Sequence, residues 1–131
     1  MFRRRRLPND LAGSFDAFLR TVEPVERAKE SVVAGVPTGR SPGVPLAEAL
    51  VGFEEGLREA RRRMPPWRVE QVEGEWAACA AAIGESLRLA ESLRLGAPEL
   101  GFDALLAEIG DLIAPLEAFE RASERFRELR R

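Results

Sequence analysis

The chain has 131 residues, of which 45% are hydrophobic and 32% charged, and its formal net charge is −2. This composition predicts one soluble globular domain, because it supplies enough apolar residues for a single core. The small net charge excludes a general attraction to nucleic acid or to membranes, so any such attraction has to come from an uneven distribution of charge.

The residue types that are missing exclude several kinds of chemistry. The sequence has no histidine, no tyrosine and a single cysteine, Cys79. Histidine is the usual general base at neutral pH and a common metal ligand, so Ser-His, Cys-His and zinc-hydrolase mechanisms are ruled out. A lone cysteine forms no disulfide within the chain. We therefore favour a non-enzymatic cytoplasmic protein with no metal, no cofactor and no catalytic residue.

The first eight residues, MFRRRRLP, are expected to be a basic tail that precedes one helical domain over 9–131. No apolar stretch follows the four arginines, so a secretory signal is not expected. The longest apolar run, Ala77 to Ile83, is too short to cross a bilayer, and we expect no membrane span.

Four segments show helical periodicity and are separated by glycine and proline. The loop over 35–45, GVPTGRSPGVP, holds three prolines and three glycines and divides the first segment from the second. Pro65-Pro66 ends the second segment, and Gly96-Ala97-Pro98 ends the third. The expected helices cover, in chain order, about 10–34, 46–64, 67–95 and 102–129.

Three of these helices would be roughly 40 Å long at 1.5 Å per residue. Long helices joined by short connections predict an all-α, antiparallel up-down four-helix bundle. Pro24 and Pro115 lie inside the first and fourth helices, where each frees the carbonyl four residues earlier, and we expect a kink at each. Facing kinks could open a small pocket.

Arginine is unevenly distributed along the chain. In an up-down bundle, the start of the first helix, the second turn and the end of the fourth helix meet at one end. The acids assigned to this end are Asp10, Glu59, Glu70, Glu73, Glu124 and Glu128. The end would then carry about +6 and the rest of the chain, with Glu75, −8. Twelve of the nineteen arginines belong to it: Arg3, Arg4, Arg5, Arg6, Arg61, Arg62, Arg63, Arg68, Arg125, Arg127, Arg130 and Arg131.

Two explanations of this basic end stay open. Arginines in the last turn of a helix complement its dipole, which accounts for Arg61–Arg63 and for the C-terminal group. Arg3–Arg6 precede a helix start, so they are either a solubilising tail or part of a polyanion site. That site would use Arg3, Arg4, Arg5, Arg6, Arg61, Arg62, Arg63 and Arg68, with only non-specific phosphate contacts to any nucleic acid.

Gly52 and Gly56 lie on the flank of the second helix, in the sequence GFEEG. An interior glycine costs a helix roughly 1 kcal/mol relative to alanine. We therefore expect that a neighbouring helix approaches closely here, either within the bundle or from a second subunit. The second alternative predicts a homodimer.

Two further features bear on an enzymatic alternative. Lys29, the only lysine, is in phase with the apolar stripe of the first helix, although Ala28 can fill the core position beside it. Glu54 and Glu55, like the group Glu70, Glu73 and Glu75, are expected on solvated faces rather than in a magnesium site.

The sequence thus predicts a helical bundle that acts through protein–protein contacts, with a protein partner or with itself. A polyanion-binding module that uses the arginine-rich end is the second hypothesis. A small-molecule site between kinked helices, with Lys29 or carboxylates as reactive groups, is the third.

Overall fold

The computed structural model describes residues 9–96 and 99–130, and this part of the chain is all-α and contains no strand. The long helices pack as a bundle around one apolar core, which confirms the predicted fold class. The elements are α1 (Asn9–Val33), α2 (Leu46–Arg62), η1 (Pro65–Trp67), η2 (Glu70–Val72), α3 (Glu73–Gly96), α4 (Phe102–Ile113), η3 (Ala114–Glu117) and α5 (Ala118–Leu129).

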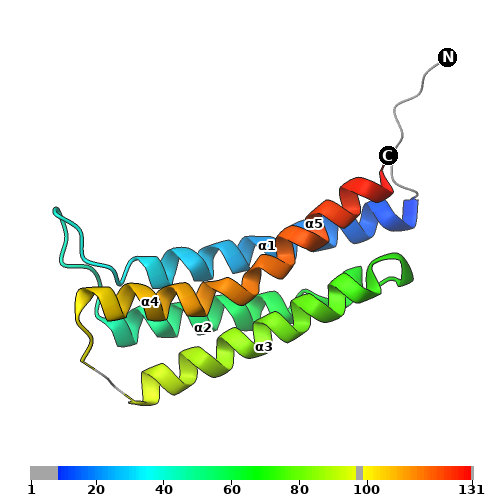
Figure 1. Ribbon diagram of the computed structural model, residues 1–131. Coiled ribbons are helices and arrows are strands. Elements are labelled where there is room, and N and C mark those ends of the chain that lie inside the picture. Colours follow the sequence, from blue (N-terminus) through cyan, green and yellow to red (C-terminus); the bar gives the residue numbers. More distant parts are fainter. Residues whose placement is uncertain (1–8, 97–98, 131) are drawn as a thin grey trace.

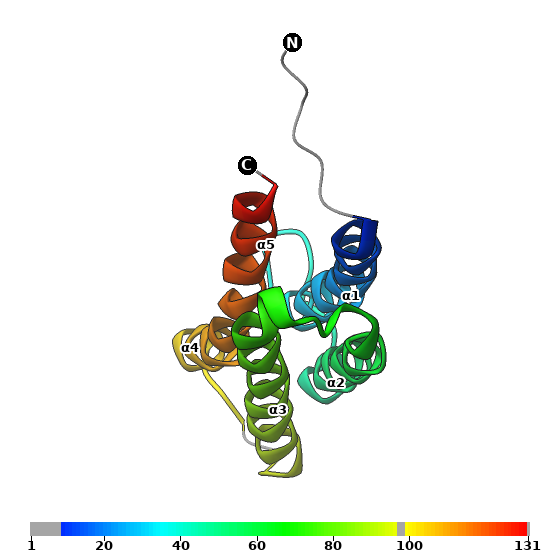
Figure 2. The same cartoon turned by 90° about the vertical axis from the view of Figure 1, so that its right-hand side faces the viewer.

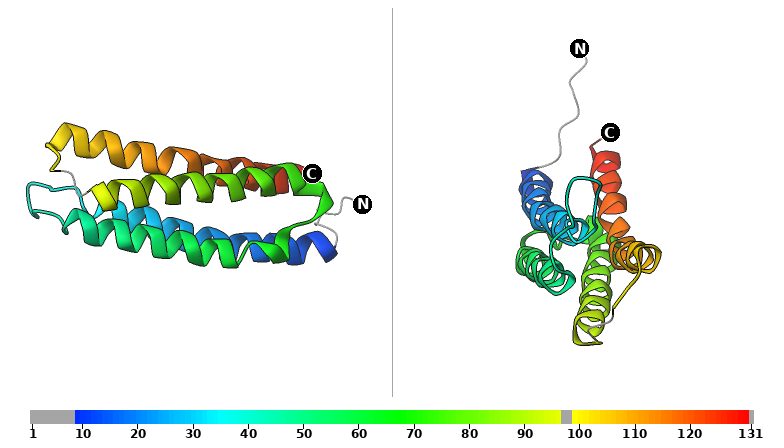
Figure 3. Two further views of the ribbon diagram at one scale, coloured as in Figure 1. Left: turned by 90° about the horizontal axis from the view of Figure 1, so that it is seen from below. Right: turned by 90° about the vertical axis from the view of Figure 1, so that its left-hand side faces the viewer.

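In Figure 1, α1, α2 and α3 lie side by side as rods, and α4 and α5 together form a further rod beside them. Each rod runs opposite in direction to the one before it, and the view from below shows the same arrangement (Figure 3). The start of α1, the α2–α3 connection and the end of α5 lie at one end of the bundle, which faces the viewer in Figure 2.

Two predicted helix boundaries differ from the structure. The fourth predicted helix is divided by the 3-10 turn η3, because Pro115 stands in its second position without an N–H to continue the α-helix. The third begins at Glu73 rather than Trp67, since Pro65-Pro66 start a 3-10 turn and Val69 is extended. By contrast, α1 continues through Pro24, and a kink at that residue stays a prediction.

Side chains from neighbouring parts of the bundle donate hydrogen bonds to main-chain carbonyl oxygens near both prolines. Pro24 frees the carbonyl of Arg20, and Arg63 Nη1 donates a hydrogen bond of 3.3 Å to that oxygen. Near Pro115, the buried hydroxyl of Ser86 donates to the carbonyl oxygen of Leu112 at 2.7 Å. These hydrogen bonds attach each proline-containing rod to its neighbour.

Trp67 fills the end of the core where the α2–α3 connection crosses α1. It is fully buried, packs edge-to-face on Phe18 at 5.0 Å between ring centroids, and donates from Nε1 to Thr21 Oγ1 at 3.1 Å. The Thr21 hydroxyl lies 3.0 Å from the carbonyl oxygens of both Ala17 and Arg63. The polar atoms of this buried contact are therefore satisfied.

α1 packs most extensively on α2, and the two glycines of α2 lie at this contact. A Cβ added at Gly56 would lie 2.8 Å from both the Pro24 carbonyl oxygen and Ala28 Cβ. One added at Gly52 would lie 3.0 Å from the Ser31 side chain. The close approach predicted for these glycines is therefore made within the bundle, by α1.

The expectation that Glu54 lies on a solvated face is wrong, because its side chain is buried. Glu54 is 1% exposed, and Arg94 of α3 donates to its two carboxylate oxygens at 2.7 and 3.3 Å. Arg58, one turn later on α2, lies 3.5 Å away. The sequence pattern placed Glu54 outside the apolar stripe, but the Arg94 side chain covers that flank and supplies a counter-charge.

We expect Gly56→Ala to destabilise the fold by about 1–3 kcal/mol, because the new methyl group meets backbone that cannot move freely. Gly110→Ala is the matched control, since an added Cβ there meets nothing within 4 Å. It should stabilise α4 by up to about 1 kcal/mol through helix propensity alone. Urea denaturation of both variants measures the difference, and a stabilising Gly56→Ala would contradict the close approach.

The burial of Glu54 predicts that neighbouring glutamates differ in their effect on stability. Glu54→Ala should lower the free energy of unfolding by about 1–3 kcal/mol, because it removes the buried partner of Arg94. Glu55→Ala changes an exposed residue and should stay within about 0.5 kcal/mol of wild type. Equal losses in thermal denaturation would mean that the Glu54–Arg94 pair does not contribute.

Candidate functional site

The structure places the described arginines of the α2–α3 connection and of the α5 end at one end of the bundle, with little excess charge among the described side chains there. Arg3–Arg6 and Arg131 lie outside the described residues. The remaining seven arginines share this end with six glutamates, so the described charge there is +1. The sixth glutamate, Glu75, had been assigned elsewhere from the sequence, yet it lies 3.5 Å from Arg125.

Most of these arginines are engaged by glutamates of the same chain. Arg62 and Arg63 both bind Glu59, with an Arg63 Nε–Glu59 Oε1 distance of 2.8 Å, and these hydrogen bonds lower the pKa of the Glu59 carboxyl. Arg68 binds Glu73 at 2.8 Å and lowers the pKa of that carboxyl in the same way.

Arg68 also contacts an aromatic side chain, that of Trp76. Its guanidinium lies 4.2 Å from the centre of the Trp76 ring, and the Trp76 Nε1 donates to the Met64 carbonyl oxygen at 2.9 Å. Arg61 is exposed on α2 and forms no ion pair within the described part of the chain. Polyanion binding at this end stays a prediction.

Gly52 and Gly56 line a polar groove of about 550 Å³ between α1 and α2. Its arginines include Arg62 and Arg63, which Glu59 already holds. Because both glycines face α1, the sequence argument for a second subunit at this position no longer holds. Self-association stays an untested prediction.

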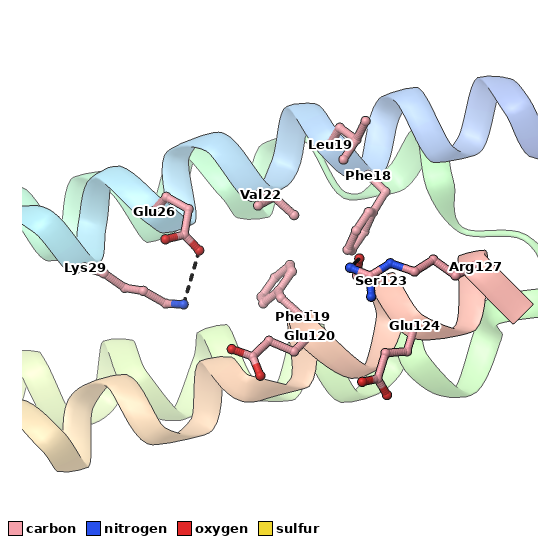
Figure 4. A pocket seen from close by; sticks show the side chains of 10 residues that line it. All are labelled: Phe18, Leu19, Val22, Glu26, Lys29, Phe119, Glu120, Ser123, Glu124 and Arg127. Carbon is pink, nitrogen blue, oxygen red and sulfur yellow. Dashed lines mark hydrogen bonds and ion pairs between the residues drawn. The ribbon is translucent and has the colours of Figure 1, made fainter.

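A second groove, of about 310 Å³, lies between α1 and α5 and has an apolar floor (Figure 4). Phe18 and Phe119 form its base, with ring centroids 6.4 Å apart, and Val22 lies beside them. Leu19 stands at the rim and is 47% exposed. Ser123 is the small α5 residue that leaves the space above Phe119 open.

Charged side chains surround this floor. At one end, Lys29 Nζ lies 3.2 Å from Glu26 Oε1; at the other, Arg127 Nη2 donates to Ser123 Oγ at 3.3 Å. Glu120 and Glu124 line the α5 side one helical turn apart. Within the described part of the chain, neither of these two carboxylates has a hydrogen bond or an ion pair.

The α1 sequence explains why a face of this helix lies open. Its core seam steps by three and four through Leu11, Ser14, Phe18, Thr21, Val25, Ala28 and Val32, all of them buried. A second seam with the same period runs through Phe15, Leu19, Val22, Glu26, Lys29 and Val33, none of them fully buried. By spacing alone, Phe15 and Val22 also fit a stripe with Leu11, Phe18 and Val25, so periodicity does not separate the two seams.

The lysine that the sequence offered as a reactive group is held in an ion pair in this structure. Lys29 lines the groove, but its side chain is 22% exposed and is paired with Glu26, while Ala28 takes the core position as expected. Within residues 9–96 and 99–130, no group of three or more acidic or cysteine side chains is arranged to hold a metal ion. In the same ranges, no helix is long and apolar enough to cross a bilayer.

Comparison with known proteins gave no match to a family model, to a curated protein or to a solved structure.

Cys79 should be chemically inert in the folded protein. Burial raises the pKa of its thiol to about 12, so roughly one thiol in 10⁴ is ionised at pH 8, and attack requires the thiolate. Labelling with a thiol reagent should be slow in buffer and fast in denaturant. Rapid labelling of the native protein would contradict the burial of Cys79 on α3.

Proposed function

We propose that this protein acts through protein–protein contacts and docks a helix of its partner in the groove between α1 and α5. The observation that carries the proposal is the second seam of α1, whose half-buried and exposed residues repeat at helical spacing beside an open groove. A heptad-like seam is the pattern by which one helix recognises another.

The size of the groove favours a protein over a small molecule. A volume of about 310 Å³ is at the lower limit of small-molecule sites, which usually enclose most of their ligand. A docked helix needs only two or three apolar anchors in such a space, and Leu19, Val22 and Phe119 offer a matching surface.

The side chains of the groove give little support to catalysis. Its lysine forms an ion pair with Glu26. Its serine accepts a hydrogen bond from Arg127 rather than donating one to a base. Nucleophilic catalysis needs an activated nucleophile with a base beside it. A binding role accounts for the same residues without this requirement.

The proposal is tested by placing a photo-crosslinking amino acid at Leu19 and, as a control, at Val51. The two positions are similarly exposed, at 47% and 43%, but Val51 lies on α2 outside the groove. We expect a defined adduct in the source cells from position 19 and none from position 51. Mass spectrometry then identifies the attached protein, which would be a second copy if the protein self-associates.

A second substitution makes the result specific to the groove. Val22→Asp introduces a charge on the apolar floor and should remove the position-19 adduct, provided that circular dichroism shows an unchanged fold. An adduct that persists in Val22→Asp, or one that forms equally from position 51, would refute docking in this groove.

A further inference from the structure

We infer that the helix accepted by the α1–α5 groove is amphipathic and carries basic residues along the flank that faces α5. This inference rests on the proposed function and specifies the partner. It follows from the length of the α1 seam, from the unequal apolar and polar walls of the groove, and from the glutamates that have no partner within the described residues.

The seam fixes the length of the occupant. Phe15 and Val33 are its first and last residues, and at 1.5 Å per residue they are about 27 Å apart along α1. A helix of about eighteen residues would follow the seam over its whole length. The apolar part runs from Phe15 to Val22, so the anchoring side chains of the partner lie towards the end at which α1 begins.

The two walls of the groove differ in polarity. α1 contributes Leu19 and Val22, whereas α5 contributes Glu120, Ser123 and Arg127 at steps of three and four above the buried Phe119. An occupant helix is therefore apolar on the side towards α1 and polar on the side towards α5. This division defines an amphipathic helix.

The charged residues of α5 indicate which charge the polar side of the partner helix carries. Glu120 and Glu124 are like charges one turn apart, an arrangement that weakens an isolated helix unless cations lie nearby. Lys29 is not paired with either of them, because its ammonium is bound to Glu26, and Arg127 of the same groove donates to Ser123 Oγ rather than to a carboxylate. Two lysines or arginines one turn apart on the partner would complement both carboxylates.

A second copy of the chain fits this description poorly. Each of its helices already contributes a buried face to its own core, so the described part offers no separate helix that could lie in the groove on its own. Two grooves placed face to face would also bring together two sets of glutamates. A separate basic helix meets neither obstacle.

The test uses two synthetic eighteen-residue helical peptides that share one leucine stripe and differ in its flanks, which are lysine in one and glutamate in the other. Fluorescence anisotropy at about 0.1 M salt, where the Debye length is about 10 Å, measures both affinities for the full chain. The lysine peptide should bind about 10-fold more tightly, because two partly exposed ion pairs replace two repulsive contacts. Glu120→Lys/Glu124→Lys should reverse this preference.

Glu91→Lys/Glu108→Lys is the matched control, since it changes the net charge equally at exposed positions outside the groove. The control should leave the preference within about 2-fold of wild type, because exposed charges separated by more than about 10 Å are largely screened. Leu19→Asp should weaken the binding of the lysine peptide. These results together would support the inference.

Three results would overturn it. Equal affinity for both peptides that Leu19→Asp abolishes would leave helix docking intact and refute the charge preference. No binding of either peptide would refute a basic amphipathic occupant, while the adduct at position 19 would decide separately whether the groove binds a protein. A dimer in sedimentation that Leu19→Asp dissociates would identify a second copy as the occupant.

Discussion

The anchoring of Trp67 against α1 is the contact on which the rest of the bundle depends. The proline pair before it sets a 3-10 turn that carries the indole into the core, where Thr21 accepts its hydrogen bond and Phe18 packs on its ring. The contact attaches the α2–α3 connection to α1. It thereby fixes which face of α1 is buried and leaves the neighbouring seam for another helix.

The tight packing of α1 on α2 and the open side towards α5 are two consequences of side-chain size. At Gly56 the α1 backbone approaches to a distance that no larger residue would permit, so α1 is held close to α2. Towards α5, the bulky rings of Phe18 and Phe119 keep the helices apart at their base, and Ser123 leaves the space above them unfilled. The groove therefore follows from the distribution of small and large residues.

The charged residues divide into those that the fold uses and those that it leaves available. Arg63 serves the fold twice, by binding Glu59 and by donating to the Arg20 carbonyl that Pro24 releases. Arg94 likewise compensates the buried Glu54. Glu120 and Glu124 have no such role in the described structure, and for this reason they carry the inference about a partner.

The sequence by itself determined the all-α bundle and the approximate extent of its helices, because periodicity and proline or glycine breaks are local signals. It also indicated a close helix contact at Gly52 and Gly56. Only the tertiary structure decided that α1 makes this contact, that Arg94 buries Glu54, and that α1 carries two seams with one of them open. Each of these depends on which rod lies beside which, and periodicity within one helix does not contain that information.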